Sequence, residues 1–246
     1  MYLYQKSGRY FAQVLDNLEH IAAEEIEELG GSSIETKYRG VSFDAPPEVL
    51  YKITYFAKIP TRILAPIINF DCHSTKYLYK TAYGIHWEDF LSLDKTFAIF
   101  SSVSNSLITH SQYASLCLKD AIVDYFREKY GDRPNVEPKF PDVWLNLYVN
   151  NNKATISLEL TGGSLHRRGY KTNPTEAPMM ENLAAAIIRI AKWDGNQKLY
   201  DPMCGSGTIL AEALLSYCKI PSCYAREKIG LFHLPEFDRH LFNKVK

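Results

Sequence analysis

The residues best suited to chemistry lie near the end of the sequence, where an acidic residue and two glycines follow a short β-prone run. The run ends at Leu199-Tyr200, and Asp201-Pro202 stops it because proline has no amide hydrogen for a sheet ladder. Gly205 and Gly207 can take positive φ and let a ligand come close to the backbone. A turn of this kind at the carboxyl end of a strand is where open α/β sheets bind nucleotide-like ligands.

An apolar helix over residues 209–215 is expected to follow the turn. Ser206 or Thr208 is expected to cap its amino-terminal end. The segment therefore predicts a strand, a glycine turn and a helix. An ordinary βα loop that holds no ligand is the alternative interpretation.

Three kinds of glycine loop compete for this turn. A phosphate-binding P-loop needs Gly-Lys-Ser/Thr, but Thr208 follows Gly207 directly. A dinucleotide fingerprint needs a third glycine three residues after the second, where this sequence has Leu210. The remaining pattern, Asp-Pro-x-Cys-Gly-Ser-Gly-Thr, closely resembles motif I of class I S-adenosylmethionine-dependent methyltransferases.

This resemblance implies S-adenosylmethionine as the cofactor. In that family the glycine turn passes under the methionine and ribose part of the cofactor, and the acidic residue, here Asp201, holds the amino-acid end directly or through water. A carboxylate suits this task because the cofactor carries an ammonium and a sulfonium charge. The expected cofactor-binding residues are Asp201, Pro202, Cys204, Gly205, Ser206, Gly207 and Thr208.

Composition limits the class of protein. The 246 residues are 46% hydrophobic and 13% aromatic, which is typical of a globular protein long enough for two modest domains. No apolar run approaches the roughly 20 residues of a membrane span, and the first residues lack a signal-peptide core. The five cysteines include no Cys-x-x-Cys pair, which argues against a zinc site or a disulfide framework and for the cytoplasm.

Charge gives only a weak indication of a polyanionic partner. The net charge is zero, which a dedicated nucleic-acid-binding protein rarely has. It runs, however, from −4 over residues 1–45 to +4 over residues 161–246. A polyanion would therefore meet local basic patches.

Hydrophobic periodicity and turn residues predict three domains, residues 1–45, 46–160 and 161–246. In the first we expect a strand over 10–14, a helix over 17–29 and a hairpin of 34–38 with 40–43. In the second we expect helices over 48–56, 76–82, 87–91 and 110–130, strands over 62–69 and 96–103, and a hairpin of 142–149 with 153–160. In the third, an irregular junction at Pro174–Pro178 precedes a helix over 179–191 and the glycine turn, and residues 221–246 contain no clear strand.

Three segments together resemble one family, the bacterial ribosomal-RNA guanine-N2 methyltransferases that carry an amino-terminal THUMP domain. The first is Leu116–Asp124 with Arg133-Pro134, which looks like the Lys-Asp-Ala-Ile-x-Asp helix and Arg-Pro turn of the THUMP module. The second is Leu158–Tyr170, similar to the segment that joins THUMP to methylase. The third is Ala177–Ala185 running into Asp201–Thr208. The resemblance covers essentially the whole chain.

The fold that this resemblance implies is an α+β amino-terminal region, ferredoxin-like plus THUMP, followed by the beginning of an α/β Rossmann-like methyltransferase domain. The implied partner is RNA, ribosomal RNA above all, whose phosphates would be met by cations. The candidate contacts are Lys119, Arg127 and Arg133, on or just after the long helix, and Arg167, Arg168 and Lys171 in the junction. The alternative is that all six are ordinary surface cations.

One departure from the family affects the predicted activity. The family catalyses transfer with an Asn-Pro-Pro-Tyr-type loop, which holds the flipped base. No such motif occurs here, since Asn173-Pro174 is followed by Thr175 and precedes motif I. The acidic residue for the cofactor ribose is expected beyond Lys246, and only 33 residues follow Ala213. We therefore expect an incomplete methyltransferase domain without catalytic residues.

Three functions remain open from the sequence. The first is a guanine-N2 methyltransferase of 23S ribosomal RNA whose chain, as given, binds RNA only. The second is a non-catalytic RNA-binding subunit that pairs with a polypeptide supplying the missing methylase half. The third is an N6-adenine-specific DNA methyltransferase, because those enzymes share the motif Asp-Pro-x-Cys-Gly-Ser-Gly. We expect no metal site and no membrane partner.

Overall fold

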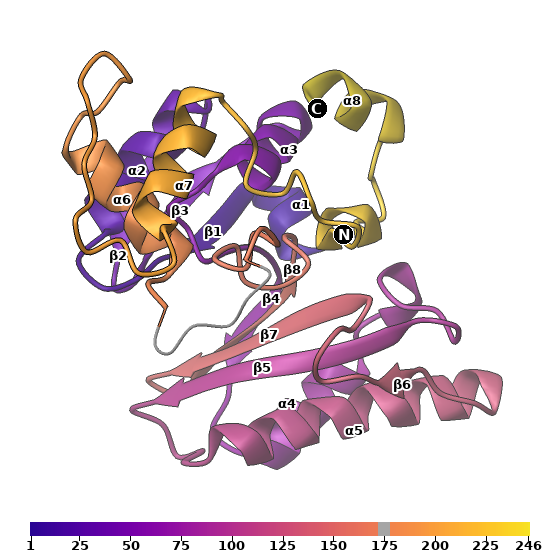
Figure 1. Ribbon diagram of the computed structural model, residues 1–246. Coiled ribbons are helices and arrows are strands. Elements are labelled where there is room, and N and C mark those ends of the chain that lie inside the picture. The colour runs from indigo at the N-terminus through magenta and orange to yellow at the C-terminus, as the bar shows by residue number, and fades with distance from the viewer. Residues whose placement is uncertain (172–177) are drawn as a thin grey trace. The chain divides into compact units, whose positions relative to one another are not determined.

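The computed structural model describes residues 1–171 and 178–246, in two compact units (Figure 1). The first unit contains Met1–Ser7, Leu64–Gly162 and Gly230–Phe237. The second unit contains Gly8–Ile63, Asp238–Lys246 and the described part of Gly163–Ile229. The predicted junction at Pro174–Pro178 lies outside the described residues except for Pro178, and Asn173 before it also lies outside them. The predicted domain limits stay predictions.

A mixed β-sheet forms the centre of the first unit. Its strands lie in the order β4 (Arg62–Asp71), β8 (Lys153–Glu159), β7 (Val143–Asn150), β5 (Thr96–Ser104) and β6 (Asn135–Val136). β8 runs antiparallel to β4 and β7, whereas β5 runs parallel to β7 and β6. Side chains alternate along β7, and Val143, Leu145, Leu147 and Val149 are fully buried. This period of two is why the segment forms a strand with one core face.

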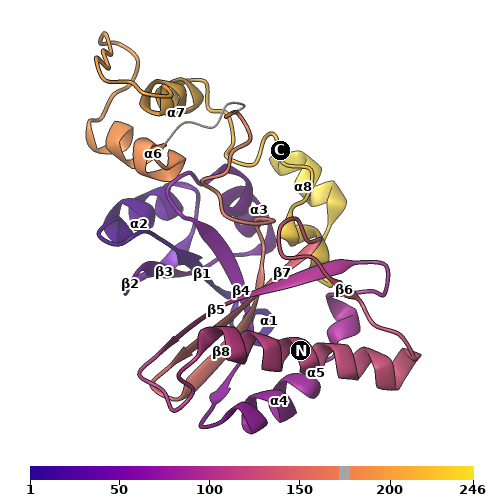
Figure 2. The same ribbon diagram turned by 60° about the horizontal axis from the view of Figure 1, so that its bottom comes forward.

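Two helices of the first unit run side by side, as both views show (Figures 1 and 2). They are α4 (Thr75–Tyr83) and α5 (Ser111–Tyr130). α5 buries Leu118, Ile122 and Phe126, which lie four residues apart and so share one face. Gly131 ends α5 in a left-handed conformation with φ of 73°.

Short elements complete the first unit. They are α1 (Leu3–Ser7) and the 3₁₀ turns η1 (Trp87–Asp89) and η2 (Gly230–His233). The backbone N–H of Leu231 donates to the Leu160 carbonyl at 2.8 Å, which ties η2 to the end of β8. Residues from both ends of the chain thus belong to this unit.

The second unit begins with an antiparallel sheet. Its strands lie in the order β2 (Ser32–Lys37), β3 (Gly40–Asp44) and β1 (Arg9–Gln13). Helices α2 (Glu19–Glu28) and α3 (Pro47–Phe56) follow β1 and β3 in the sequence. A side chain at Gly40 would meet the Phe11 ring and the Ala12 carbonyl, so glycine is required where these strands approach.

Three further helices belong to the second unit: α6 (Glu181–Ile190), α7 (Thr208–Tyr217) and α8 (Arg239–Val245). α6 packs against α7 and also contacts α2, while α8 packs against α3. The Asp238 side chain caps α8 by accepting from the backbone N–H of His240 at 2.8 Å and of Leu241 at 3.1 Å. This cap explains a helix that the sequence analysis did not predict.

The structure confirms the predicted fold class and most of the predicted elements, but the strand expected to end at Leu199-Tyr200 is wrong. Residues 198–200 form no strand. A strand needs a neighbour to accept and donate its backbone hydrogen bonds, and none of the described strands pairs with this segment. The segment before the glycine turn therefore belongs to none of the described strands.

Candidate functional site

The glycine turn opens into solvent. Gly205 has φ of 53° and Gly207 has φ of 71°, and a Cβ at either position would meet no atom within 4 Å. The backbone N–H of Gly207 donates to the Cys204 carbonyl at 2.7 Å and closes the turn. Met203, between Asp201 and the turn, is 90% exposed. A ligand can therefore reach the backbone of this turn without displacing any side chain.

Helix α7 starts at Thr208 without a side-chain cap, so the predicted capping by Ser206 or Thr208 is wrong. Gly207 itself is the residue before the helix, and no side chain bonds to the first N–H groups. The hydroxyls of Ser206 and Thr208 instead bond to each other at 3.0 Å. The amino-terminal N–H groups of α7 are left to a ligand or to water, where the helix dipole favours electron-rich atoms.

Asp201 precedes this open turn and keeps a free carboxylate oxygen. Its Oδ1 accepts a hydrogen bond from the Met203 backbone N–H at 3.2 Å. Pro202 and Cys204 are exposed beside it. The turn thus offers a carboxylate for a cationic ligand group and backbone N–H groups for hydroxyls or other acceptors. That these seven residues bind a cofactor stays a prediction.

The two neighbouring arginines of the junction, Arg167 and Arg168, differ in their exposure to solvent. Arg167 is exposed, whereas the Arg168 side chain is only 3% exposed. Arg168 Nε lies 2.7 Å from a carboxylate oxygen of Glu212, which is fully buried on α7. Its other nitrogens donate to the carbonyls of Leu165 at 3.1 Å and Lys58 at 2.9 Å. Arg168 therefore holds the second unit together, and any role in RNA binding stays a prediction.

Tyr170 and Lys58 complete the buried cluster around Glu212. The Tyr170 hydroxyl donates to Glu212 at 3.0 Å, and burial together with the Glu212 charge raises the pKa of Tyr170. Lys58 Nζ donates to the Leu215 carbonyl on α7 at 2.8 Å, and burial lowers the pKa of Lys58. This cluster was not predicted from the sequence, although Glu212 is the one charged residue in an apolar helix, which indicates a buried partner.

The remaining predicted RNA contacts lie at exposed or half-exposed positions, most of them beside carboxylates. Lys119 lies 2.5 Å from Asp120, and Arg127 lies 3.8 Å from Asp124. Lys171 bonds to the Met179 carbonyl at 2.7 Å and lies 3.3 Å from Glu181. Arg133 follows the end of α5 and is half-buried. Nearby carboxylates therefore offset the positive charge of Lys119, Arg127 and Lys171.

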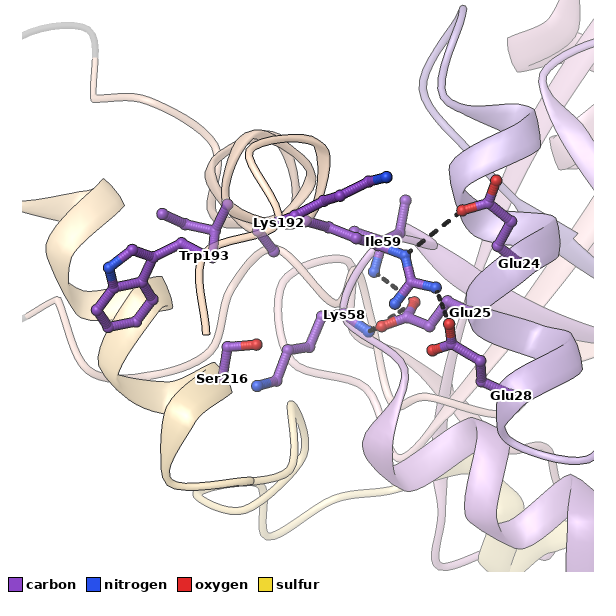
Figure 3. A pocket seen from close by; sticks show the side chains of 11 residues that line it. Glu24, Glu25, Glu28, Lys58, Ile59, Lys192, Trp193 and Ser216 are labelled. Carbon is purple, nitrogen blue, oxygen red and sulfur yellow. Dashed lines mark hydrogen bonds and ion pairs between the residues drawn. The ribbon is translucent and has the colours of Figure 1, made fainter. Parts of the chain in front are cut away.

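A cavity of about 400 Å³ lies within the second unit among α2, α6, α7 and residues 58–59 (Figure 3). Glu24 and Glu28 lie toward Arg189, which pairs with them at 4.0 and 2.5 Å. Glu25 accepts from the backbone N–H groups of Lys58 and Ile59, while burial raises its pKa. The acidic and arginine side chains of the wall already have partners within the protein.

Apolar stripes on α6 and α7 remain exposed. Ile190 is 59% exposed on α6, and Leu214 and Tyr217 are 60% and 61% exposed on α7. On each helix the stripe has the spacing i, i+4, i+7 of a face that packs on another layer. The stripes are Leu183, Ile187 and Ile190 on α6, and Leu210, Leu214 and Tyr217 on α7.

No group of three or more His, Cys, Asp or Glu side chains suited to a metal ion occurs in residues 1–171 and 178–246. The same ranges contain no helix with the length and apolar character of a membrane span. All five cysteines are free thiols.

Comparison with known families matches three successive segments. Residues 9–64 match the RlmL ferredoxin-like domain, residues 72–159 the THUMP domain, and residues 168–242 the RMKL-like methyltransferase domain. The chain therefore contains a THUMP domain and an RMKL-like methyltransferase segment. The THUMP match covers α4, α5 and strands β5 to β8 of the first unit, and the methyltransferase match covers α6, the glycine turn and α7.

Among related proteins, ribosomal RNA large subunit methyltransferase K/L of Aliivibrio salmonicida is 36% identical over 238 residues, 97% of this chain and 34% of that protein. A Synechocystis protein described as a candidate RNA methyltransferase is 35% identical over 96% of this chain and 62% of its own length. The chain thus spans only about a third of the K/L-type relatives.

Two solved structures share this fold. The structure of SMU.472 in complex with SAH is 26% identical, with a TM-score of 0.79 over 96% of this chain and 62% of that one. A Listeria monocytogenes protein described as a predicted N6-adenine-specific DNA methylase has a TM-score of 0.80 over 98% of this chain and 64% of that one. At 23% identity, the second likeness shows the fold alone.

Proposed function

We propose that this chain belongs to a methyltransferase that transfers a methyl group from S-adenosylmethionine to guanine N2 in 23S ribosomal RNA, and that the 246 residues bind RNA without performing the transfer. The observation that carries the proposal is a THUMP domain joined in one chain to a methyltransferase segment with an open motif I turn. The K/L-type relatives are named as ribosomal RNA methyltransferases, which supports RNA as the partner.

The proposed cofactor site is the turn from Asp201 to Thr208. Its support is the open space at Gly205 and Gly207, the uncapped start of α7 and the carboxylate of Asp201. A related structure holds SAH, the product that the cofactor leaves behind. Asp201 would hold the cationic amino-acid end, while the glycine turn would lie under the ribose.

The methyl transfer itself is an in-line displacement. A bond forms from guanine N2 to the methyl carbon while the bond from that carbon to sulfur breaks, and N2 loses a proton. The reaction depends mainly on positioning of the base and the cofactor. The sequence of these 246 residues contains no Asn-Pro-Pro-Tyr motif to hold the base, so we assign no catalytic residue among them. We also propose a cytoplasmic location, where ribosomal RNA is modified.

The test uses the purified chain with labelled S-adenosylmethionine and 23S ribosomal RNA. We expect RNA to be retained and no label to be transferred. Label that is transferred by the wild type and lost in Asp201→Ala would contradict the proposal, since that variant excludes a contaminating enzyme. Asp194→Ala is the matched control, because Asp194 also accepts local amide bonds in an exposed loop. Retention on duplex DNA instead of RNA would favour the adenine-N6 alternative.

A second candidate function is an RNA-binding subunit of a split methyltransferase. The observation in its favour is the pair of exposed apolar stripes on α6 and α7, which a sheet layer from another polypeptide would cover. It predicts weak SAH binding by the chain alone and tighter binding after addition of the carboxyl-terminal part of the Synechocystis relative. Tight SAH binding by the isolated chain in calorimetry would contradict it.

A further inference from the structure

We propose that the outer face of α4, formed by Lys76, Tyr77 and Lys80, is the principal RNA-contacting surface of the THUMP domain. This inference rests on the proposed RNA-binding function and names the surface that performs it. These three residues, called the α4 surface below, were not among the RNA contacts expected from the sequence. The chemical class of partner is an RNA segment with an accessible phosphate backbone and at least one unstacked base.

The geometry of α4 places the three side chains outward. Lys76 and Lys80 are four residues apart, so they lie one above the other on the same side of the helix. Both are exposed, and Tyr77 beside them is 52% exposed. Leu78 and Ala82 are buried on the opposite side and anchor α4 to the core of the first unit. The helix therefore presents two cations and one aromatic ring on a fixed frame.

Lys76 and Lys80 form no ion pair with a carboxylate of the described residues. Within the described residues, neither has a carboxylate oxygen within 4 Å, whereas Lys119 pairs with Asp120 and Arg127 with Asp124 on α5. A neighbouring carboxylate repels phosphate and offsets the attraction of the cation, so the α5 cations contribute less. An unpaired lysine that neutralises a phosphate releases counterions and adds to affinity.

The carboxylates that face α4 from α5 are engaged by tyrosines. The Tyr79 hydroxyl donates to Asp124 at 2.8 Å, and this bond raises the pKa of Tyr79 to about 12. The Tyr83 hydroxyl donates to Glu128 in the same way, one turn further along. Tyr79 and Tyr83 lie on the α5-facing side of α4, so these acids are drawn toward the helix–helix contact.

Aromatic rings around the α4 surface supply a stacking platform. The rings of Tyr77 and Phe70 have centroids 6.4 Å apart, which supports the tyrosine from the end of β4. Cys117 Sγ donates to the Thr75 carbonyl at 3.0 Å, so the first turns of α5 lie beside the start of α4. Tyr113, one turn before Cys117, is 60% exposed. Bases stack on such rings with little dependence on sequence, and lysines hold the adjoining phosphates.

The first experiment compares two double variants of the full chain. The probe is a labelled RNA hairpin with a single-stranded 3′ tail, and the dissociation constant is measured over a series of salt concentrations. We expect Lys76→Gln/Lys80→Gln to reduce the slope of log affinity against log salt by about 1.5, as for two lost phosphate contacts. Lys119→Gln/Arg127→Gln removes the same number of charges and is expected to leave the slope nearly unchanged. Lys76→Arg/Lys80→Arg is expected to retain the slope.

The second experiment separates stacking from charge. Tyr77→Ala is expected to weaken binding roughly tenfold without changing the salt slope, and Tyr77→Phe to keep the wild-type affinity. Far-UV circular dichroism shows whether each variant is folded. If a glutamine or alanine variant unfolds, Lys76→Arg/Lys80→Arg and Tyr77→Phe still test the proposal through their RNA affinity.

The outcomes distinguish the surface from the function. If the wild type retains no RNA, the proposed function fails and this inference with it. If the wild type binds but the glutamine variant of the α4 surface matches it, or the α5 variant loses more, the inference is overturned while the function stands. A reduced slope of log affinity against log salt in Lys76→Arg/Lys80→Arg would also overturn the inference.

Discussion

The THUMP domain and the methyltransferase segment bury their apolar side chains to very different extents. In β7 of the THUMP domain, alternate side chains such as Leu147 are completely buried by elements of the same unit. In the methyltransferase segment, Ile190 and Leu214 keep about 60% of their surface exposed in the described structure. The first unit therefore closes its own core, whereas no described element covers the regular apolar faces of α6 and α7.

Polar contacts hold the methyltransferase segment where apolar packing is incomplete. Arg168 joins the junction to Glu212 on α7, and Lys58 reaches the α7 carbonyl of Leu215. A buried ion pair is stable only while both partners are present, because a single buried charge loses its hydration without compensation. The two regions therefore should respond differently to the loss of charge and to the loss of apolar volume.

The largest expected effect is the loss of the buried cation. Arg168→Ala leaves Glu212 charged and buried, and should reduce the free energy of unfolding by about 3–5 kcal/mol. Arg167→Ala, one residue earlier and exposed, should change it by less than about 0.5 kcal/mol. Urea unfolding followed by the fluorescence of Trp193 measures both. Equal effects at the two positions would refute the assigned difference in burial.

Next in size is the loss of apolar volume. Leu147→Ala removes a fully buried side chain from the THUMP core and should cost about 2–5 kcal/mol of stability. Leu214→Ala makes the same change on the exposed stripe of α7 and should cost less than about 0.5 kcal/mol. Unfolding followed through Trp144 and Trp193 reports the two regions. A large loss for Leu214→Ala would mean that the stripe is covered in solution.

Two glycines offer a matched backbone comparison. Gly131 after α5 and Gly207 before α7 both have φ near 70°, and a Cβ at either would meet no atom within 4 Å. Alanine at each should therefore cost about 1–2 kcal/mol from the left-handed conformation alone. Thermal unfolding checks the pair. A much smaller cost at Gly207 would indicate that the motif I turn relaxes when no ligand is bound.

The smallest expected effect is a pH dependence in the THUMP unit. Burial alone would raise the pKa of Glu88, but hydrogen bonds from Lys129 and Tyr125 outweigh it and lower the pKa to about 2. A depressed carboxyl pKa stabilises the fold above its usual value of 4.5, and this contribution disappears as the pH falls toward 2. Because Lys129 is 45% exposed, solvent screening limits the effect to less than about 1 kcal/mol.

The measurement compares the wild type and Glu88→Gln in urea unfolding from pH 5.5 to 2.5. The difference in their unfolding free energies should shrink as the pH falls. A difference that stays constant with pH would show that packing, and not the charge of Glu88, accounts for the effect of Glu88→Gln on the unfolding free energy.

Most elements could be predicted because their signals are local. The helix at 110–130 and the hairpin of 142–149 with 153–160 follow from periodicity and turn residues, and the structure places them within one or two residues. The strand at Leu199-Tyr200 failed because a strand is a relation between two segments, and β-prone residues supply only one of them. The helix α8 was missed because it is short and depends on a cap at Asp238.

The sequence by itself determined the order of elements, the glycine turn and the family motifs, since each depends on residues close together in the chain. It could not distinguish Arg167 from Arg168, because neighbouring arginines have the same chemistry until the fold assigns one a partner. Arg168 pairs with Glu212, which lies 44 residues away in the sequence. Carboxylates on α5 pair with Lys119 and Arg127. Tertiary structure alone decided which of these cations are paired with carboxylates, because the environment of a charge is set by residues brought together in space.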